Sequence, residues 1–152
     1  PSELVTEHAL KYLIKEDNCT PDIVVTLTPC HPFTSTYQLN KGIKMLIDNE
    51  DWDSVVTVKK VKEHPQWMID LKEDNSCETI LGNNLDGDFN VSQRLKKYYY
   101  LHGAFFINRV SSFLTAPSLY GEKWGAIVVN SKNSIDIDEP EDLLLAQSMI
   151  SQ

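Results

Sequence analysis

The chain has 152 residues, of which 41% are hydrophobic, and a formal net charge of −8. This length and composition suit a single domain over residues 1–152 with one core. The acidic balance argues against nucleic acid or an anionic membrane as a partner, because both bind clustered Lys and Arg side chains. No apolar run reaches the length of a transmembrane helix. The three cysteines are widely spaced, so neither a disulfide framework nor a structural zinc site is indicated, and we expect a reducing, cytoplasmic setting.

Helical and extended patterns alternate along the chain. Apolar residues at helical spacing predict helices over 2–15 and 36–49, and short apolar runs predict buried strands over 22–27 and 53–58. The later segments are, in order, an excursion strand at 67–71, a polar loop at 72–90, a strand at 98–108, short helical pieces at 109–121, a strand at 124–130 and a helix at 139–151. This alternation is typical of a three-layer α/β/α fold with a mostly parallel, Rossmann-like sheet.

Two aspartates near the C-terminus lie where a strand is expected to lead into a helix. In an extended segment Asp136 and Asp138 project to one face, and Pro140 suits the first helical turn. The simpler interpretation is a capped helix after a strand, with Asp138 or Glu139 as the cap. The second interpretation is a divalent-metal site, because neighbouring carboxylates repel each other unless a cation lies between them. The spacing alone favours the capped helix.

Ligands of doubly wound sheets bind beyond the carboxyl ends of the strands. We therefore expect ligand contacts near Asp136 and in the loops that begin at Thr28, Lys59 and Asn108. His31 follows the first of these strands and is either a phosphate or sugar contact or a solvated loop residue. Its neighbour Cys30 has no His and Asp partners at suitable sequence positions, which argues against a cysteine nucleophile. In the strand at 98–108, Tyr99 is expected to pack inward.

The order of several motifs resembles that of the acylneuraminate cytidylyltransferases, also called CMP-sialic acid synthetases. The residues 1–4 read Pro-Ser-Glu-Leu, like the end of that family's Arg-Pro-x-Glu-Leu element. The strand and turn at 22–33, Tyr99, Gly103 and the Asp-Ile-Asp sequence at 136–138 also match family elements. The resemblance spans essentially the whole chain, although only the Asp-Ile-Asp motif is individually specific.

The resemblance implies a reaction in which a sialic-acid-like sugar attacks the α-phosphate of CTP and pyrophosphate is released. It implies Mg²⁺ bound by the catalytic residues Asp136 and Asp138, and a homodimer in which residues 72–97 reach the neighbouring subunit. The substrate-binding residues that it suggests are Thr28, His31, Gln93, Tyr99, His102 and Gly103.

The sequence also departs from the family where substrates bind. The six glycines are scattered, so the family's glycine-rich phosphate loop is missing from these residues, and the chain resembles the C-terminal two-thirds of such an enzyme. Cys30 and His31 replace a Thr-Ser pair, and His102 replaces an Asn. These changes favour an alternative in which the domain is a catalytically inactive module that binds a ligand or serves in assembly.

Overall fold

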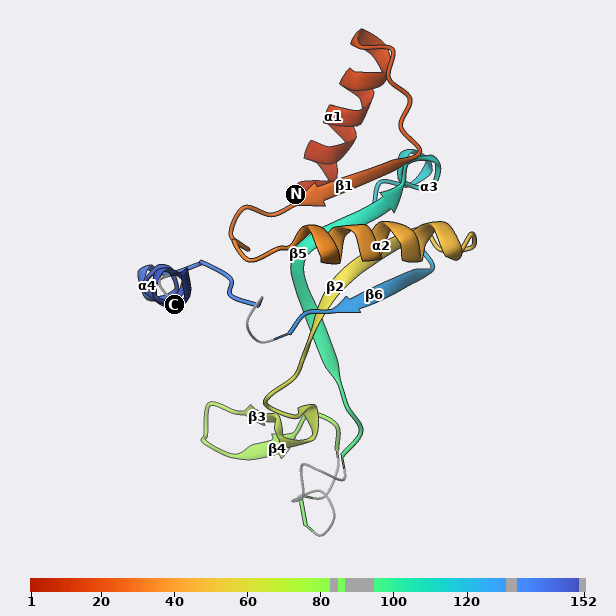
Figure 1. Ribbon diagram of the computed structural model, residues 1–152. Helices are drawn as coiled ribbons and strands as arrows, with labels where there is room; N and C mark the ends of the chain where they lie inside the picture. Colours follow the sequence, from red (N-terminus) through yellow and green to blue (C-terminus); the bar gives the residue numbers. More distant parts are fainter. Residues whose placement is uncertain (83–84, 87–94, 131–133, 151–152) are drawn as a thin grey trace. The chain divides into compact units, whose positions relative to one another are not determined.

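The computed structural model describes residues 1–82, 85–86, 95–130 and 134–150 (Figure 1). Contacts divide the chain into two compact units. The first unit combines Pro1–Lys59 with Leu101–Gln152, and the second comprises Lys60–Tyr100. This division by contacts does not test whether residues 1–152 form a single domain, so that expectation stays a prediction.

The helices and strands of the first unit follow the sequence pattern closely. In chain order they are α1 (Ser2–Glu16), β1 (Ile23–Leu27), α2 (Thr36–Asp48), β2 (Ser54–Lys60), β5 (Tyr99–Arg109), α3 (Val110–Thr115), β6 (Trp124–Val128) and α4 (Pro140–Ile150). Each of the corresponding predictions is confirmed, with differences of one or two residues at the ends of most elements. The strong signals were apolar runs for the strands and a 3.6-residue period for the helices.

The four strands form a mixed sheet in the order β1-β5-β2-β6. Strands β2 and β6 are parallel, whereas β1 and β5 are antiparallel, with Leu27 opposite Phe105. The backbone N–H of Arg109 at the end of β5 donates to the carbonyl of Asp53, just before β2. Strands β1, β2 and β6 therefore run in one direction, as expected of a mostly parallel sheet, whereas β5 runs against them and makes the sheet mixed.

Helices cover both faces of this sheet, which confirms the layered α/β arrangement (Figure 1). One core cluster joins α1 and α3 to the sheet, and the other joins α2 to the opposite face. The first cluster contains Leu10, Val56, Val58, Phe106, Val110, Phe113 and Leu119. The second contains Leu46, Val55, Ala104, Phe105, Ile107 and Ile127. Neighbouring strand residues such as Val55 and Val56 belong to different clusters, because side chains alternate across a strand.

Helix α2 approaches the sheet closely because its buried residue Gly42 has no side chain. A Cβ atom at this position would lie 2.4 Å from Cδ1 of Ile107 and 3.0 Å from Cδ1 of Ile127. The helix begins with a capping box in which the Ser35 side chain accepts from the backbone N–H of Gln38, while the Gln38 side chain accepts from that of Ser35. These two features fix where the loop after β1 ends.

The second unit contains the short helix η1 (Pro65–Trp67) and the antiparallel strands β3 (Ile69–Leu71) and β4 (Cys77–Thr79). The predicted excursion strand is confirmed in shorter form by β3. Strand β4 lies within the segment expected to be a polar loop, so that expectation was wrong in part. β4 is only three residues long and mostly exposed, and such a short strand has no apolar alternation by which the sequence would reveal it.

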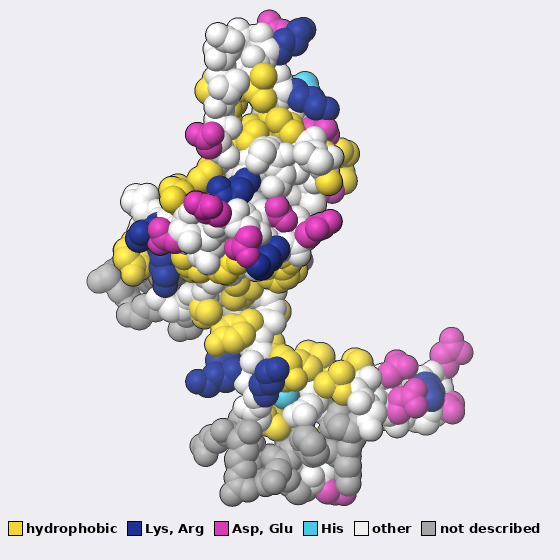
Figure 2. Space-filling view, turned by 90° about the vertical axis from the view of Figure 1, so that its right-hand side faces the viewer, with side chains coloured by type: hydrophobic (Ala, Val, Ile, Leu, Met, Phe, Trp, Pro, Cys, Tyr) yellow, Lys and Arg dark blue, Asp and Glu magenta, His cyan; other side chains and the backbone are white. Residues whose placement is uncertain are grey.

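Acidic and basic side chains lie side by side on the face shown in Figure 2. Two ion pairs, Lys44 with Asp48 and Lys11 with Glu7, connect successive turns of a helix. None of the helices that the structure describes is long and apolar enough to span a membrane.

Candidate functional site

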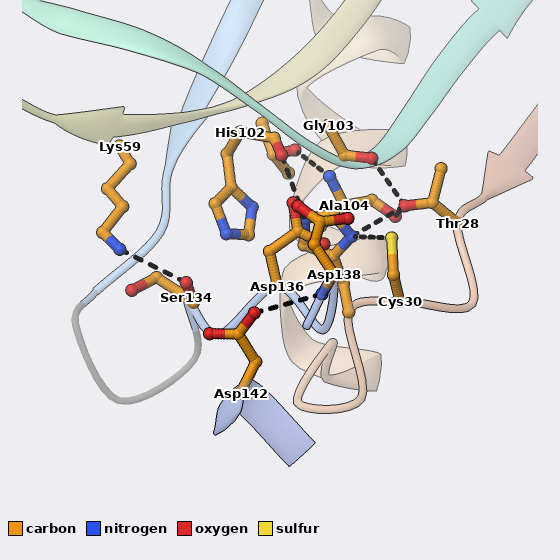
Figure 3. A network of polar contacts seen from close by, with 12 residues as sticks. Thr28, Cys30, Lys59, His102, Gly103, Ala104, Ser134, Asp136, Asp138 and Asp142 are labelled. Carbon is orange, nitrogen blue, oxygen red and sulfur yellow. Dashed lines mark hydrogen bonds and ion pairs between the residues drawn. The ribbon is translucent and has the colours of Figure 1, made fainter. Parts of the chain in front are cut away.

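A group of polar residues gathers at the edge of the sheet where β1, β2 and β6 end (Figure 3). Thr28 follows β1, Lys59 is near the end of β2, and Asp136 lies in the segment that leads from β6 to α4. Because β5 runs antiparallel to β1, its beginning rather than its end lies at this edge. His102 and Gly103 thereby join the group.

Thr28 connects the loop after β1 to strand β5. Its hydroxyl Oγ1 lies 2.6 Å from the carbonyl oxygen of Gly103 and 3.0 Å from that of Ala104. A carbonyl oxygen only accepts, so the two carbonyls share the single hydroxyl hydrogen of Thr28. Gly103 has a φ of +79°, a left-handed conformation that favours glycine and turns its carbonyl toward the loop. The predicted site residues Thr28 and Gly103 are thus in contact, and both help to hold the loop.

His31 is buried at the centre of the group. Its Nε2 lies 3.0 Å from the carbonyl oxygen of His102 and 3.5 Å from Oδ2 of Asp136. Since the carbonyl only accepts, Nε2 is the donor in this bond. The other ring nitrogen, Nδ1, lies 2.9 Å from Oγ1 of Thr28 and 3.2 Å from Sγ of Cys30. The His31 side chain is therefore a built part of the fold rather than a solvated loop residue.

Cys30 lies beside His31 with its sulfur partly covered. Burial raises the pKa of the Cys30 thiol, and the hydrogen bond and negative charge of Asp136 raise it further. Tertiary structure thus supplies the His and Asp neighbours that sequence positions alone did not indicate. A raised pKa keeps the sulfur protonated, however, and so agrees with the expectation that Cys30 is not a nucleophile.

The segment containing the two aspartates is fixed at both ends. The backbone N–H of Ile137 donates to the carbonyl of Cys30 over 2.9 Å. The backbone N–H groups of Asp138 and Glu139 donate to Oδ2 of Asp142 at 3.2 Å and 3.0 Å. A capped helix is therefore present, with Asp142 reaching back to these two residues. Asp138 is exposed.

Three atoms of the group lack partners. Oδ1 of Asp136 is buried and makes no hydrogen bond, and the same is true of both ring nitrogens of His102. The His102 ring packs edge-on against His31, with 4.5 Å between the ring centroids. Burial lowers the pKa of His102, and the charges of His31 and Lys59 lower it as well. The negative charge of Asp136 opposes this shift, and so does a contact with the backbone of Ser134 that falls short of hydrogen-bond geometry. Buried polar atoms without partners are rare, so these mark a place for a ligand.

Lys59 supplies a cation to the same edge of the sheet. Its Nζ donates to the carbonyl of Ser134 over 3.3 Å, which holds the side chain beside the segment that carries Asp136. The sequence placed Lys59 only at the start of a loop. Its role at the edge depends on β2 and β6 being neighbours.

Two other predicted residues, Tyr99 and Asn108, lie away from this group, and a third is not among the described residues. Tyr99 is 46% exposed and belongs to the second unit, so the expectation that it packs inward was wrong. Asn108 is at the end of β5, at the opposite edge of the sheet, and its side chain donates to the carbonyls of Ser118 and Leu119. The antiparallel direction of β5 explains both this reversal and the presence of His102 at the site. Gln93 falls outside the residues that the structure describes.

Cys30, His31 and Asp136 form the only group of three or more metal-ligating side chains of this kind in the described part of the chain, with ligand atoms within 4.8 Å of one another. Sequence reasoning paired Asp136 with Asp138 and did not find this group. Nothing in the spacing signals it, because Asp136 is distant from the other two residues in the sequence.

The arrangement of strands and helices resembles that of a solved enzyme. The chain matches a crystal structure described as 4-diphosphocytidyl-2C-methyl-D-erythritol synthase from Anaerococcus prevotii with a TM-score of 0.65 and 16% sequence identity. The match covers 100% of this chain and 67% of the synthase chain. No protein-family model and no curated protein sequence matches the chain. At this identity the similarity establishes the fold.

Proposed function

We propose that the chain is part of a nucleotidyltransferase that transfers CMP from CTP to a sialic-acid-like sugar. The observation that carries the proposal is the position of Asp136, which lies with Lys59 and His102 at the edge of the sheet where strands β1, β2 and β6 end. The fold that the chain shares with a diphosphocytidyl-sugar-alcohol synthase supports a cytidine nucleotide as the ligand. The sugar comes from the motif resemblance, above all the Asp-Ile-Asp sequence at 136–138.

In the proposed reaction a sugar hydroxyl attacks the α-phosphorus of CTP. A new oxygen–phosphorus bond forms as the bond to the bridging oxygen breaks, and pyrophosphate leaves. Such a transfer needs positioning and neutralisation of charge more than covalent chemistry. Lys59 is a cation at this edge that would meet the phosphates. The unpartnered nitrogens of His102 are available to the sugar hydroxyls.

Mg²⁺ is the cofactor that this reaction implies. It prefers oxygen ligands and keeps several waters, so one or two carboxylates suffice. Asp136 fits this requirement, because its Oδ1 is buried without a partner, and Asp138 lies two residues further along the same segment. When bound, the ion would neutralise charge on the phosphates. A homodimer and the contact of residues 72–97 with a second subunit remain predictions.

The test is isothermal titration of the chain with CTP and Mg²⁺, combined with a pyrophosphate-release assay in the presence of N-acetylneuraminic acid. We expect CTP binding and pyrophosphate release, both lost in Asp136→Asn. Asp17→Asn is the matched control, because Asp17 is exposed at the end of α1. If the wild-type chain binds no CTP, the proposal fails.

A second candidate is a non-catalytic ligand-binding or assembly module of the same fold. It is favoured by the contacts that Cys30 and His31 already make with their neighbours, at positions where the family has Thr and Ser. Binding of CTP or of the sugar without pyrophosphate release would support this module.

A further inference from the structure

We infer that Cys30, His31 and Asp136 form a binding site for a borderline-soft divalent metal ion of the Zn²⁺ class. This site goes beyond the proposed nucleotidyl transfer, which calls for Mg²⁺, and it shares Asp136 with the Mg²⁺ site proposed there, so the two ions would compete for this carboxylate. Its basis is the side chains that tertiary structure brings together at the sheet edge: a sulfur, an imidazole and a carboxylate, with ligand atoms within 4.8 Å of one another.

The donor set selects the class of metal. Mg²⁺ takes oxygen ligands and is poorly served by sulfur and imidazole nitrogen, whereas Zn²⁺ accepts Cys, His and Asp. In the group of three only Asp136 provides oxygen. Cys30 and His31 therefore make the site unsuited to Mg²⁺ and suited to Zn²⁺.

The hydrogen bonds of His31 leave one nitrogen available as a ligand. Nε2 donates to the His102 carbonyl, which is the arrangement in which a metal-binding His directs its other nitrogen at the ion. Nδ1 then carries the lone pair of the ring, and it lies 2.9 Å from Oγ1 of Thr28, whose hydrogen is used by the β5 carbonyls, and 3.2 Å from Sγ of Cys30. Ligands of one tetrahedral ion at bond lengths of about 2.0–2.3 Å are separated by roughly 3–4 Å, so sulfur and nitrogen already have a suitable spacing.

Two further observations point to an absent ligand at this place. Oδ1 of Asp136 is buried and makes no hydrogen bond, although the Asp136 side chain as a whole is 41% exposed. His102 is 8% exposed, both of its ring nitrogens lack hydrogen bonds, and its ring lies against that of His31. Three protein ligands leave a fourth position, as in sites where zinc binds water or substrate. His102, whose ring packs against that of His31, is an additional donor beside the group.

The loop that carries two of the ligands is held in advance. Thr28 binds the β5 carbonyls, and the Ile137 N–H donates to the Cys30 carbonyl, so the loop and the Asp136 segment are joined without the ion. Little ordering is then required when the metal binds, which favours affinity.

The experiment uses the whole chain and Co²⁺ as a spectroscopic substitute for Zn²⁺, with no nucleotide present. We expect one Co²⁺ per chain and an absorption band from charge transfer between the Cys30 thiolate and cobalt. Isothermal titration with Zn²⁺ in excess Mg²⁺ measures affinity. Cys30→Ser should abolish the band and weaken Zn²⁺ binding by about 100-fold. Loss of a residue that only supports a metal ligand already weakens binding by up to about 100-fold, so loss of a direct ligand should have at least this effect. The matched controls Cys19→Ser and Cys77→Ser remove exposed cysteines and should leave both unchanged.

Two results would overturn the inference: absence of Zn²⁺ and Co²⁺ binding at micromolar metal in the wild-type chain, or a band that persists in Cys30→Ser. If Cys30→Ser does not fold, as judged by circular dichroism, Asp136→Asn replaces it. Weaker Zn²⁺ binding in that variant supports the site, and unchanged binding refutes it. Since no nucleotide is used, failure here is separate from failure of CTP binding or pyrophosphate release.

Discussion

Nε2 of His31 lies 3.5 Å from Oδ2 of Asp136, although the two residues come from opposite ends of the chain. This contact joins the loop after β1 to the segment before α4. It also explains why Asp136 differs from Asp138, which is exposed. The two aspartates are equivalent in the sequence motif but not in the folded chain. Asp136 is therefore the position where we expect substitution to have the greater effect on ligand binding.

Gly103→Ala should destabilise the chain and weaken the site. The φ of Gly103 is +79°, and a residue with a Cβ pays about 1–3 kcal/mol in such a conformation. The shift of its carbonyl would also loosen Thr28 and, through it, His31. Gly82→Ala is the matched control, since Gly82 has a φ of +64° but lies in the second unit. Both variants should unfold at a lower denaturant concentration than the wild-type chain, whereas only Gly103→Ala should lower Zn²⁺ affinity. Equal affinities would contradict this role.

Gly42→Ala should destabilise the chain by about 1–3 kcal/mol, the usual cost of overpacking a core. The new methyl group would lie 2.4 Å from Cδ1 of Ile107. Ile107→Val removes that atom, so in the double variant the cost of Gly42→Ala should be smaller than in the wild-type background. Urea unfolding of the four chains measures the coupling. Additive free energies of unfolding would show that another contact causes the loss.

Asp53→Asn should destabilise the chain at neutral pH and much less in acid. The backbone N–H of Lys123, followed by Ser112 and the backbone of Glu122, lowers the pKa of Asp53 below its ordinary value of 3.8. Its contribution to stability is therefore present above 3.8 and lost as pH falls through the depressed pKa. We expect a loss on the order of 1 kcal/mol at pH 7, because the carboxylate is partly exposed. Thermal unfolding at several pH values measures it, with Asp70→Asn on exposed β3 as the control.

His102 should remain neutral at pH 7. Burial is the main reason that its pKa lies below the ordinary value of 6.5. A His with a depressed pKa binds more protons when unfolded, so stability should be complete above pH 6.5 and decline as pH falls below it. NMR titration of the imidazole should give a midpoint below 6.5. His102→Gln should remove this part of the pH dependence, and an unchanged decline would assign it to another group.

Much of the local structure was readable from the residues. Short apolar runs marked β1 and β2, and helical periodicity marked α1 and α2, because these patterns follow from burying one face or both faces of an element. The direction of β5 was not readable. It depends on how the chain returns from residues 60–100, and the same apolar run suits either direction.

The sequence by itself determined the order and type of the elements, the acidic surface and the Asp-Ile-Asp motif, because all of these are local or compositional. Tertiary structure decided which residues share the sheet edge. Because β5 is antiparallel to β1, His102 rather than Asn108 lies at the site. The fold also places Cys30 and His31 beside Asp136. A site assembled from separate strand ends depends on strand order and direction, and a one-dimensional pattern does not encode either of them.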